Sequence, residues 1–428
     1  MPRSLLTYKQ ALAWLYSLQR FGIKLGLENI QRLLKELHID LGSARASRAV
    51  SGTSPETSAS AKVIHVAGTN GKGSVCAMID SICRAQGYRT GLFTSPHLIT
   101  FRERIRLNGE MVTQEAVASG LTAIRDLVAD WDPHPTFFEV ATALALNHFV
   151  EAKVDIVILE TGLGGRLDAT NAIRSDVSVI TPVDFDHQQW LGQSLREIAA
   201  EKAGIIKPRV PVISAVRRRE AAEVIRKRAA ECEAPIEYVT APYDETPIAL
   251  AGSHQKQNAA LAIAALDAAK IDISESAIVD GLANVEWPAR FQRWDERTII
   301  DGAHNPAAAK VLTDTWREFF SDQRATLILA VLSDKDLRGI CEALAPISDY
   351  VLLPKICSER AAVPEKLAKV LAGTAPSLPY SIIPSIADAL NQARKRPQPI
   401  LLTGSLHFAG EALAHLRSKP AAFEECAQ

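Results

Sequence analysis

The amino-acid sequence predicts an α/β protein in which a large, doubly wound parallel sheet is followed by a second, smaller α/β unit. Short β-branched segments alternate with amphipathic helical segments, which is typical of parallel sheets covered by helices. This alternation begins again near residue 288. A chain of 428 residues is long enough for two or three domains. We therefore expect an N-terminal domain over residues 1–286 and a C-terminal domain over residues 287–428.

The composition is that of an ordinary soluble globular protein, with 47% apolar and 23% charged residues. A net charge of -1 gives no bulk attraction to nucleic acids or anionic membranes. No apolar run approaches the ~20 residues of a membrane helix, and the N-terminus lacks a signal-peptide pattern. The six cysteines are scattered and suit reduced thiols. We expect a cytoplasmic monomer that acts on small molecules, with no nucleic-acid or membrane partner.

Two helices with apolar stripes are predicted first, at residues 8–20 and 28–38, joined by a glycine-punctuated turn. Residues 42–61 are rich in Ser, Ala, Thr and Gly, which predicts a loop. The helices and strands expected after residue 62 are, in order, strand 63–67, helix 76–83, strand 90–94, helices 113–130 and 136–150, strands 155–160 and 176–181, helix 194–206, strand 210–214, helix 219–231, strand 235–240, helix 254–269, strand 297–300, helix 306–319, strand 325–331, helix 336–345, strand 348–353, helix 385–394, strand 399–402 and helix 407–416.

The strand at residues 63–67 leads into a glycine-rich turn that carries a lysine and a hydroxyl group. Glycines let backbone N–H groups point at phosphate oxygens, and the helix N-terminus adds partial positive charge. Lys72 can reach terminal phosphates, while Thr69 or Ser74 can cap the helix or contact a metal. The match to the P-loop pattern is imperfect, because Gly73 separates Lys72 from Ser74. Nucleotide binding is favoured over the alternative, a tight turn with a surface lysine.

Three polar residues, Ser95, Glu160 and His187, follow predicted parallel strands at their carboxyl ends. These ends share one sheet edge, where ligands bind in open α/β sheets. Each residue alone is better explained as a cap or loop residue, and the segment 95–109 alone as a solvated loop. Together, beside a P-loop, they favour a Mg²⁺ site, although His is a less usual ligand for this ion.

Two further positions are ambiguous on their pattern. Lys202 lies in a predicted helix and, on pattern alone, is a surface lysine. Asp301 and His304 flank a Gly-Ala turn after an apolar strand, which suits a polar-ligand site and an Asx-turn with a helix start equally well.

Seven segments between residues 8 and 416 carry a resemblance to a known family. They are residues 65–74 (HVAGTNGKGS), 94–98 (TSPHL), 159–171 (LETGLGGRLDATN), 201–205 (EKAGI), 301–306 (DGAHNP), 332–336 (LSDKD) and 403–407 (TGSLH). Together they resemble the bifunctional dihydrofolate synthase/folylpolyglutamate synthases of the Mur ligase superfamily. The run at residues 163–171 separates this family from other Mur ligases.

The resemblance implies a Mur ligase-like fold and an ATP-dependent ligase that joins L-glutamate to dihydropteroate and to reduced folates. By similarity, ATP is bound by Thr69, Asn70, Gly71, Lys72, Gly73, Ser74, Asn258, Arg290, Asp301 and His304. Magnesium, at two sites, is held by Ser95, Glu160 and His187. Lys72, Lys202 and His187 are the implied catalytic residues, with Lys202 carbamylated, and a monovalent cation is a further implied cofactor. The pteroate side is implied to include Lys24, Leu25, Gly26, Leu27, Thr136, Phe137, Phe138, Glu139, Leu167, Asp168 and Ala169.

The sequence departs from the family at residues 288–291, where Pro-Ala-Arg-Phe replaces Pro-Gly-Arg-Phe. We expect the missing glycine to stiffen or shift the hinge between the domains, while Arg290 is kept. Two other functions stay open at this stage. One is a Mur-type ligase acting on a UDP-linked cell-wall precursor, and the other is a nucleotide-gated binding protein without ligase activity.

Overall fold

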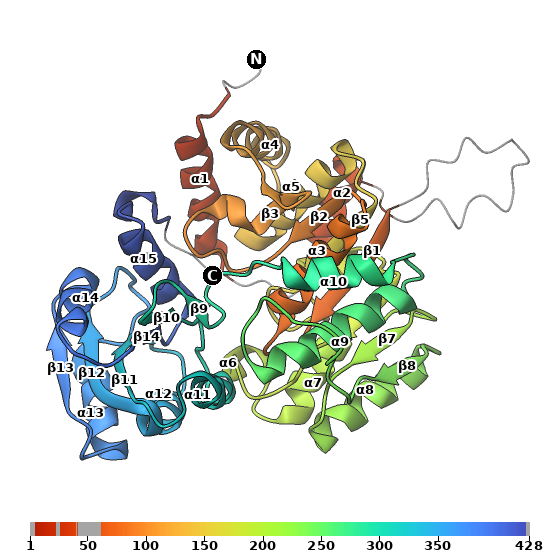
Figure 1. The fold of residues 1–428 in the computed structure, drawn as a ribbon. Coiled ribbons are helices and arrows are strands. Elements are labelled where there is room, and N and C mark those ends of the chain that lie inside the picture. Colours follow the sequence, from red (N-terminus) through yellow and green to blue (C-terminus); the bar gives the residue numbers. More distant parts are fainter. Residues whose placement is uncertain (1–4, 23–25, 40, 42–60, 425–428) are drawn as a thin grey trace, which may run out of the picture.

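The computed structural model describes residues 5–22, 26–39, 41 and 61–424. The predicted site residues Lys24 and Leu25 lie outside this set. Figure 1 shows two lobes, each built on its own sheet. The predicted α/β class, with a larger sheet followed by a smaller one, is confirmed. Among the described helices, none has the length and apolar content of a membrane span.

The first sheet has eight strands in the order β4-β3-β2-β5-β1-β6-β7-β8. Its strands are β1 (Lys62–Ala67), β2 (Thr90–Phe93), β3 (Ile105–Leu107), β4 (Glu110–Met111), β5 (Ile156–Glu160), β6 (Val177–Ile180), β7 (Val212–Ser214) and β8 (Ile236–Tyr238). All pairings are parallel except those of β3 and β4, which form an antiparallel edge. The expectation of a solvated loop at residues 95–109 is wrong, because this segment forms β3 and buries Phe101, Arg104 and Ile105.

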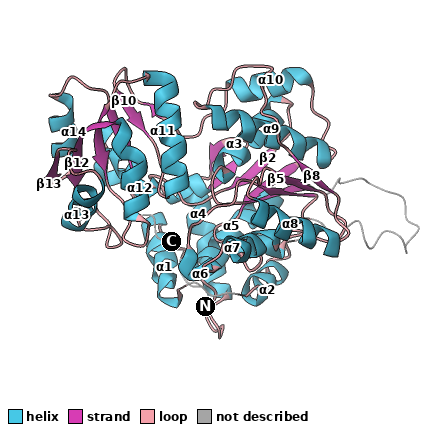
Figure 2. Ribbon diagram, turned by 90° about the horizontal axis from the view of Figure 1, so that it is seen from below, coloured by secondary structure: helices cyan, strands magenta, loops and turns pink. Residues whose placement is uncertain are grey.

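Helices cover both faces of this sheet, as expected for parallel strands with apolar side chains on each side. The helices of this lobe are α1 (Tyr8–Ser17), α2 (Glu28–Glu36), α3 (Lys72–Ala85), α4 (Gln114–Leu127), α5 (Phe137–Glu151), α6 (Gln188–Leu191), α7 (Leu195–Ala203), α8 (Arg219–Glu231), α9 (Ser253–Ala268) and α10 (Glu275–Ala283). In Figure 2, α3, α9 and α10 lie on one side of the sheet and α5, α7 and α8 on the other. Along β1, Ile64 and Val66 pack on the first side and Val63 on the second.

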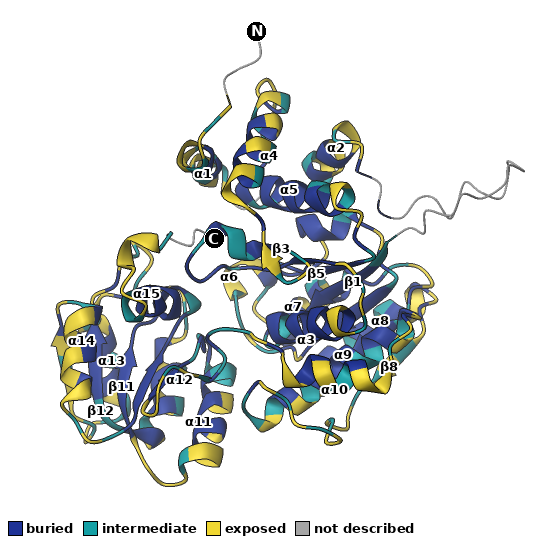
Figure 3. Cartoon of the chain, turned by 45° about the horizontal axis from the view of Figure 1, so that its top comes forward, coloured by how far each residue is buried: buried dark blue, intermediate teal, exposed yellow. Residues whose placement is uncertain are grey.

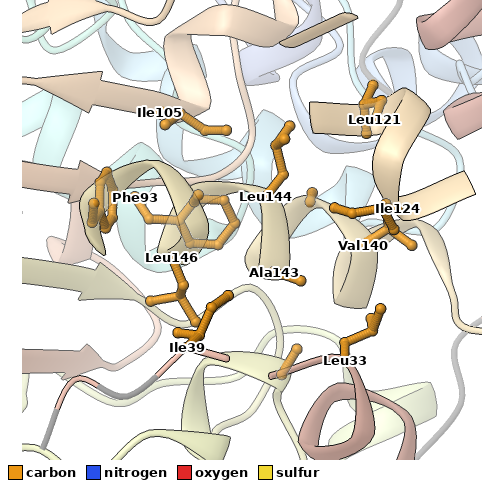
Figure 4. Close-up of a cluster of buried hydrophobic side chains, with 14 of the residues drawn as sticks. Leu33, Ile39, Phe93, Ile105, Leu121, Ile124, Val140, Ala143, Leu144 and Leu146 are labelled. Atoms are coloured by element: carbon orange, nitrogen blue, oxygen red, sulfur yellow. The ribbon is translucent and has the colours of Figure 1, made fainter. Parts of the chain in front are cut away.

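The apolar core holds the central helices in place. Figure 4 shows part of the cluster that α2, α4 and α5 form with the sheet, including Leu33, Leu121, Ile124, Val140, Leu144, Phe93 and Ile105. Burying a large apolar side chain contributes about 1.5–3 kcal/mol. On the other side, α3 is buried from Gly73 to Cys83, and Figure 3 shows α3 in the interior of the lobe. The turn that precedes α3 is therefore attached to a fixed element.

The second sheet has six strands in the order β13-β12-β11-β14-β10-β9, and β9 is its one antiparallel strand. The strands are β9 (Gln292–Arg293), β10 (Thr298–Ile300), β11 (Ala325–Leu329), β12 (Ser348–Pro354), β13 (Tyr380–Ile383) and β14 (Ile400–Thr403). The helices are α11 (Pro306–Phe320), α12 (Leu337–Leu344), α13 (Pro364–Thr374), α14 (Ile386–Arg394) and α15 (Leu406–Leu416). Seven of the helices and strands in the described residues lie outside the expected set, namely β3, β4, α6, α10, β9, α13 and β13.

The lobes touch where α15 and the chain after it meet the loop that follows β2. A Cβ atom on Gly410 would lie 1.9 Å from the Leu98 carbonyl oxygen, so only glycine allows this approach. Beyond α15, the Glu424 carboxylate accepts hydrogen bonds from the Thr100 hydroxyl (3.1 Å) and the Phe101 N–H (2.6 Å). The C-terminal lobe is thereby anchored beside the segment that carries Ser95.

Ala289, which replaces the family's glycine, adopts a left-handed backbone conformation with φ of 57°. Its carbonyl oxygen accepts hydrogen bonds from the Gly302 N–H and from Arg290 Nη1. The conformation that a glycine would adopt freely is therefore kept by an alanine, at a steric cost of about 1–2 kcal/mol.

The variant Ala289→Gly should unfold within about 0.5 kcal/mol of the parent chain, because relief of the left-handed strain offsets the loss of a fully buried methyl group and the greater chain entropy of glycine. Equilibrium unfolding in urea measures the change. Ala200→Gly, at an exposed position inside α7, is the matched control and should lose about 1 kcal/mol. Equal destabilisation by both substitutions would contradict the assignment of strain to Ala289.

Candidate active site

A cleft of about 1150 Å³ lies between the carboxyl edge of the first sheet and the C-terminal lobe. Every predicted site residue that the structure describes lines this cleft, with the exception of Leu27. The residues expected to bind ATP, metal and pteroate are thus brought together from positions as distant in sequence as Gly26 and His304. Their individual roles remain predictions, which the geometry below makes more specific.

The glycine turn between β1 and α3 requires glycine at two positions. Gly68 has φ of 149°, and Gly71 has φ of 92°, immediately before α3 begins at Lys72. A Cβ atom on Gly71 would lie 2.8 Å from Asn258 Oδ1. No side chain caps the N-terminus of α3. Its first N–H groups therefore face the cleft as an anion-binding site.

The lysine of the turn folds back over it. Lys72 Nζ donates hydrogen bonds to the carbonyl oxygens of Gly68 (3.2 Å) and Thr69 (3.3 Å). The Thr69 hydroxyl donates to the Asp184 carbonyl oxygen (3.0 Å), which ties the turn to the loop after β6. Thr69 therefore stabilises the turn through the loop after β6, and it does not cap α3 as had been considered.

Ser95 and Glu160 meet at the ends of the neighbouring strands β2 and β5, as the strand-end argument predicts. The Ser95 N–H donates to Glu160 Oε2 (3.1 Å). The Ser95 hydroxyl is buried and, among the described residues, has no hydrogen-bond partner. Burial raises the pKa of Glu160, and the charge of Lys72 opposes this shift. Two buried oxygen groups with spare acceptor capacity suit a hard divalent cation.

His187 also lines the cleft and is the residue before α6, with φ of 51°. Burial lowers its pKa to about 4, so the imidazole is neutral near pH 7, which is the form that binds metals. In the part of the chain that the structure describes, no three His, Cys, Asp or Glu side chains converge to hold a metal. An ion at Ser95 and Glu160 would therefore take further ligands from phosphate oxygens and water.

Asp186 is a site residue for which the sequence reasoning assigned no role. Its carboxylate lies 2.6 Å from Lys335 Nζ, 3.5 Å from His304 Nε2 and 3.1 Å from Asn305 Nδ2. Asn305 also exchanges hydrogen bonds with Asn70 of the glycine turn. Burial opposes ionisation of Asp186, but the contact with His304 and the charge of Lys335 outweigh it and hold the pKa well below its usual range. The available sequence signals were that Asp186 is next to His187 and that Lys335 lies within the family segment 332–336.

Lys202 is buried, with 4% of its surface exposed, so the reading of it as a surface lysine is wrong. The end of α7 lies under the glycine turn, and Lys202 Nζ donates to the Gly68 carbonyl oxygen (2.9 Å). Burial, reinforced by the charge of Lys72, lowers the pKa of this amine to about 7. A substantial fraction of the amine is therefore uncharged at neutral pH.

The wall expected to face pteroate is formed by α5 and by the loop after β5. The Thr136 hydroxyl and N–H both donate to the Glu139 carboxylate, which closes the capping box of α5. Phe138 leaves no room for a side chain at Gly162, where a Cβ atom would lie 2.5 Å from the ring. Leu167 completes this largely apolar wall.

Asp301 was predicted either to form an Asx-turn before a helix or to belong to a polar-ligand site, and the structure is compatible with both. Its carboxylate accepts from the Phe291 N–H (2.8 Å) and, as an Asx-turn, from the Ala303 N–H (2.8 Å). Asn305 caps α11, as the helix-start reading predicts. Asp301 and His304 also line the cleft, so the local turn and the candidate ligand site coexist.

Comparison with known proteins places this geometry in a family. Residues 66–239 match the Mur ligase middle domain, and residues 289–406 match the Mur ligase, glutamate ligase domain. The chain is 33% identical over 445 residues to the dihydrofolate synthase/folylpolyglutamate synthase of Bacillus subtilis, covering 96% of this chain and 99% of that one. This chain belongs to the dihydrofolate synthase/folylpolyglutamate synthase family. As a member of this family it is an ATP-dependent ligase that forms C–N bonds between folates and glutamate.

Other members of the dihydrofolate synthase/folylpolyglutamate synthase family show the same breadth of similarity. The Escherichia coli enzyme is 35% identical over 405 residues, covering 89% of this chain and 93% of that one. The structure of E. coli FolC in complex with DHPP and ADP has a TM-score of 0.83 at 31% identity, covering 95% and 98% of the two chains. The Yersinia pestis enzyme complexed with AMPPNP and Mn ion has a TM-score of 0.84 at 29% identity, covering 97% and 100%.

The depressed pKa of Lys202 predicts how stability varies with pH. Below about pH 7 the folded chain holds a buried charge, and this cost disappears as the pH rises from about 7 toward the ordinary value of 10.5. Lys202→Met should therefore raise the melting temperature most at pH 6 and progressively less up to pH 9. Calorimetry in CO₂-depleted buffer measures this, with Lys227→Met, on exposed α8 surface, as the control. A pH-independent difference would contradict the burial of a titrating amine.

Proposed function

We propose that this chain joins L-glutamate to dihydropteroate, which gives dihydrofolate, and also extends folylpoly-γ-glutamate, with ATP converted to ADP and phosphate. The observation that carries the proposal is the single cleft in which the glycine turn, the Ser95–Glu160 pair, the apolar wall at Phe138 and the C-terminal residue Asp301 face one another.

We place the domain boundary between residues 286 and 287, and we propose a cytoplasmic monomer without nucleic-acid or membrane partners.

The ligands named for the relatives support this assignment. The E. coli enzyme was solved with DHPP and ADP, and a Y. pestis enzyme with Mn, AMPPNP and L-glutamate. The named ligands thus include nucleotides, a divalent metal and the amino acid that the proposed reaction requires.

The proposed reaction has two steps. The substrate carboxylate attacks the γ-phosphorus of ATP, forming an acyl phosphate and releasing ADP. The amine of glutamate then attacks the acyl carbon, an amide bond forms, phosphate leaves, and the amine loses a proton. The first N–H groups of α3 and the Lys72 ammonium bind the phosphates and offset their charge. Arg290 and Asp301 contact ATP from the C-terminal lobe, so closure of the lobes completes the site and excludes water.

The residues at the sheet edge fit a divalent cation, because the buried Ser95 hydroxyl has spare acceptor capacity beside the Glu160 carboxylate. We assign Ser95, Glu160 and His187 as metal ligands shared between two such ions, with a monovalent cation as a further candidate. When bound, Mg²⁺ neutralises charge on the phosphates.

Lys202 is proposed to be carbamylated. Its buried amine, with a pKa of about 7, is partly uncharged and can attack CO₂, forming an N–C bond and releasing a proton. The resulting carbamate is an anion beside Lys72 and the metal ligands, where it would replace an unfavourable buried cation with a favourable negative charge.

Phosphate release with ATP, Mg²⁺ and L-glutamate tests the proposed function. Release with both dihydropteroate and a reduced folate as acceptor is the expected result. Release with the folate alone would remove dihydropteroate from the proposal and place the pteroate assignments at Thr136–Glu139 and Asp168 in doubt. Release with neither, by a folded chain that binds ATP, would favour the binding-protein or UDP-precursor alternatives.

Glu160→Gln should reduce turnover by at least about a hundredfold, because the amide no longer offers a charged ligand to a cation. The fold should be retained, since a neutral side chain is easier to bury than the carboxylate. Steady-state phosphate release and circular dichroism measure the two effects. Glu220→Gln, at an exposed position on α8, is the control. Near-normal turnover by Glu160→Gln would exclude the metal assignment.

A further inference from the structure

A buried histidine on β1, His65, is absent from the reaction described above and yet is connected to the cleft. Its side chain is fully buried in the centre of the first sheet. His65 Nε2 lies 2.8 Å from the hydroxyl of Thr170, a residue of the short 3-10 helix η4 (Ala169–Ala172). Thr170 is likewise fully buried.

The hydrogen-bond directions follow from the Asp168 carboxylate. The Thr170 hydroxyl and N–H both contact Asp168 Oδ1, at 2.5 and 3.1 Å. A carboxylate only accepts, so the hydroxyl donates its hydrogen to Asp168 and must accept from His65. Burial lowers the pKa of His65 to about 3, which leaves one N–H on the neutral ring. That hydrogen is on Nε2, because the Thr170 hydroxyl accepts there, while buried Nδ1 has no hydrogen-bond partner among the described residues.

The second oxygen of the carboxylate extends this chain to the rim of the cleft. Asp168 Oδ2 accepts hydrogen bonds from the Gly162 N–H and the Leu163 N–H, both at 2.9 Å. Asp168 thus bridges the two ends of the loop formed by residues 162–170. The loop packs closely on the Phe138 ring, where Gly162 has no space for a side chain.

We propose that His65 is a positioning residue for the acceptor substrate, acting through Thr170 and Asp168 to fix the loop of residues 162–170 against Phe138 of α5 in the apolar wall of the cleft. The proposal rests on the proposed function, in which this wall faces the pteroate group. His65 comes from β1, the strand that also leads into the phosphate-binding turn. One strand therefore positions both the nucleotide turn and the acceptor loop. The KM for ATP reports on the turn, and the KM for dihydropteroate reports on the loop.

The test uses a pair of substitutions at Thr170 in the full-length chain. Thr170→Val keeps the shape and removes the hydroxyl, whereas Thr170→Ser keeps the hydroxyl. Thr170→Val should raise the KM for dihydropteroate about fivefold to tenfold and change the KM for ATP less than about twofold. Thr170→Ser should restore the dihydropteroate KM to near the parent value. His65→Gln, as a second variant, should raise the KM for dihydropteroate with the same selectivity. The double variant of His65→Gln and Thr170→Val should raise this KM no more than Thr170→Val alone.

The control is Thr326→Val, which removes a buried threonine hydroxyl from β11, remote from the cleft and without a hydrogen-bond partner among the described residues. It should leave both KM values unchanged. The proposal would be overturned if Thr170→Val lowered the melting temperature but left both KM values unchanged. Equal increases in the KM values for ATP and dihydropteroate would overturn it as well. If the parent chain itself releases no phosphate with dihydropteroate or folate, the proposed function fails instead, and the two failures are distinguished.

Discussion

The buried carboxylate of Asp186 joins the two lobes at the place where the glycine turn faces the C-terminal sheet. The side chains of Asp186 and Lys335 are only 7% and 6% exposed and lie 2.6 Å apart. An ion pair this deeply buried costs desolvation energy, so removing one partner leaves a charge that is unfavourable by about 3–5 kcal/mol. His304 and Asn305 surround the same carboxylate, and Asn305 reaches Asn70 in the turn. The relative position of the lobes is therefore tied to the site.

The remainder of the site depends on this arrangement and on the rigidity of the first sheet. β1 and α3 are buried along nearly their whole length, so the turn between them has little freedom. The carboxyl ends of β2 and β5 bring Ser95 and Glu160 together on one side of that turn, and Lys202 lies beneath it. The turn, the proposed metal ligands and the proposed acceptor loop share one sheet edge, where little reorganisation is needed when charge develops.

The sequence predicted the parallel strands well, because apolar β-branched runs such as that of β5 are buried on both faces. It missed the two-residue strand β4 and the helix α13, whose partners are set by tertiary packing. The strand-end argument located Ser95 and Glu160 correctly. The helical pattern was misleading for Lys202, because an amphipathic pattern cannot show that the last turn of a helix lies under a loop from β1. Asp186 was missed for a similar reason, since its partner Lys335 is remote in sequence.

A double-mutant cycle between Asp186 and Lys335 tests most directly whether this contact assembles the nucleotide site across the lobes. The measured quantity is the dissociation constant for ATP with Asp186→Asn, Lys335→Met and the double variant. The account predicts that each single substitution raises the dissociation constant for ATP at least about tenfold. The double variant should bind ATP no more weakly than the weaker-binding single variant. If the fold-increase in the double variant equals the product of the two single fold-increases, the account is contradicted, because the two residues then act independently.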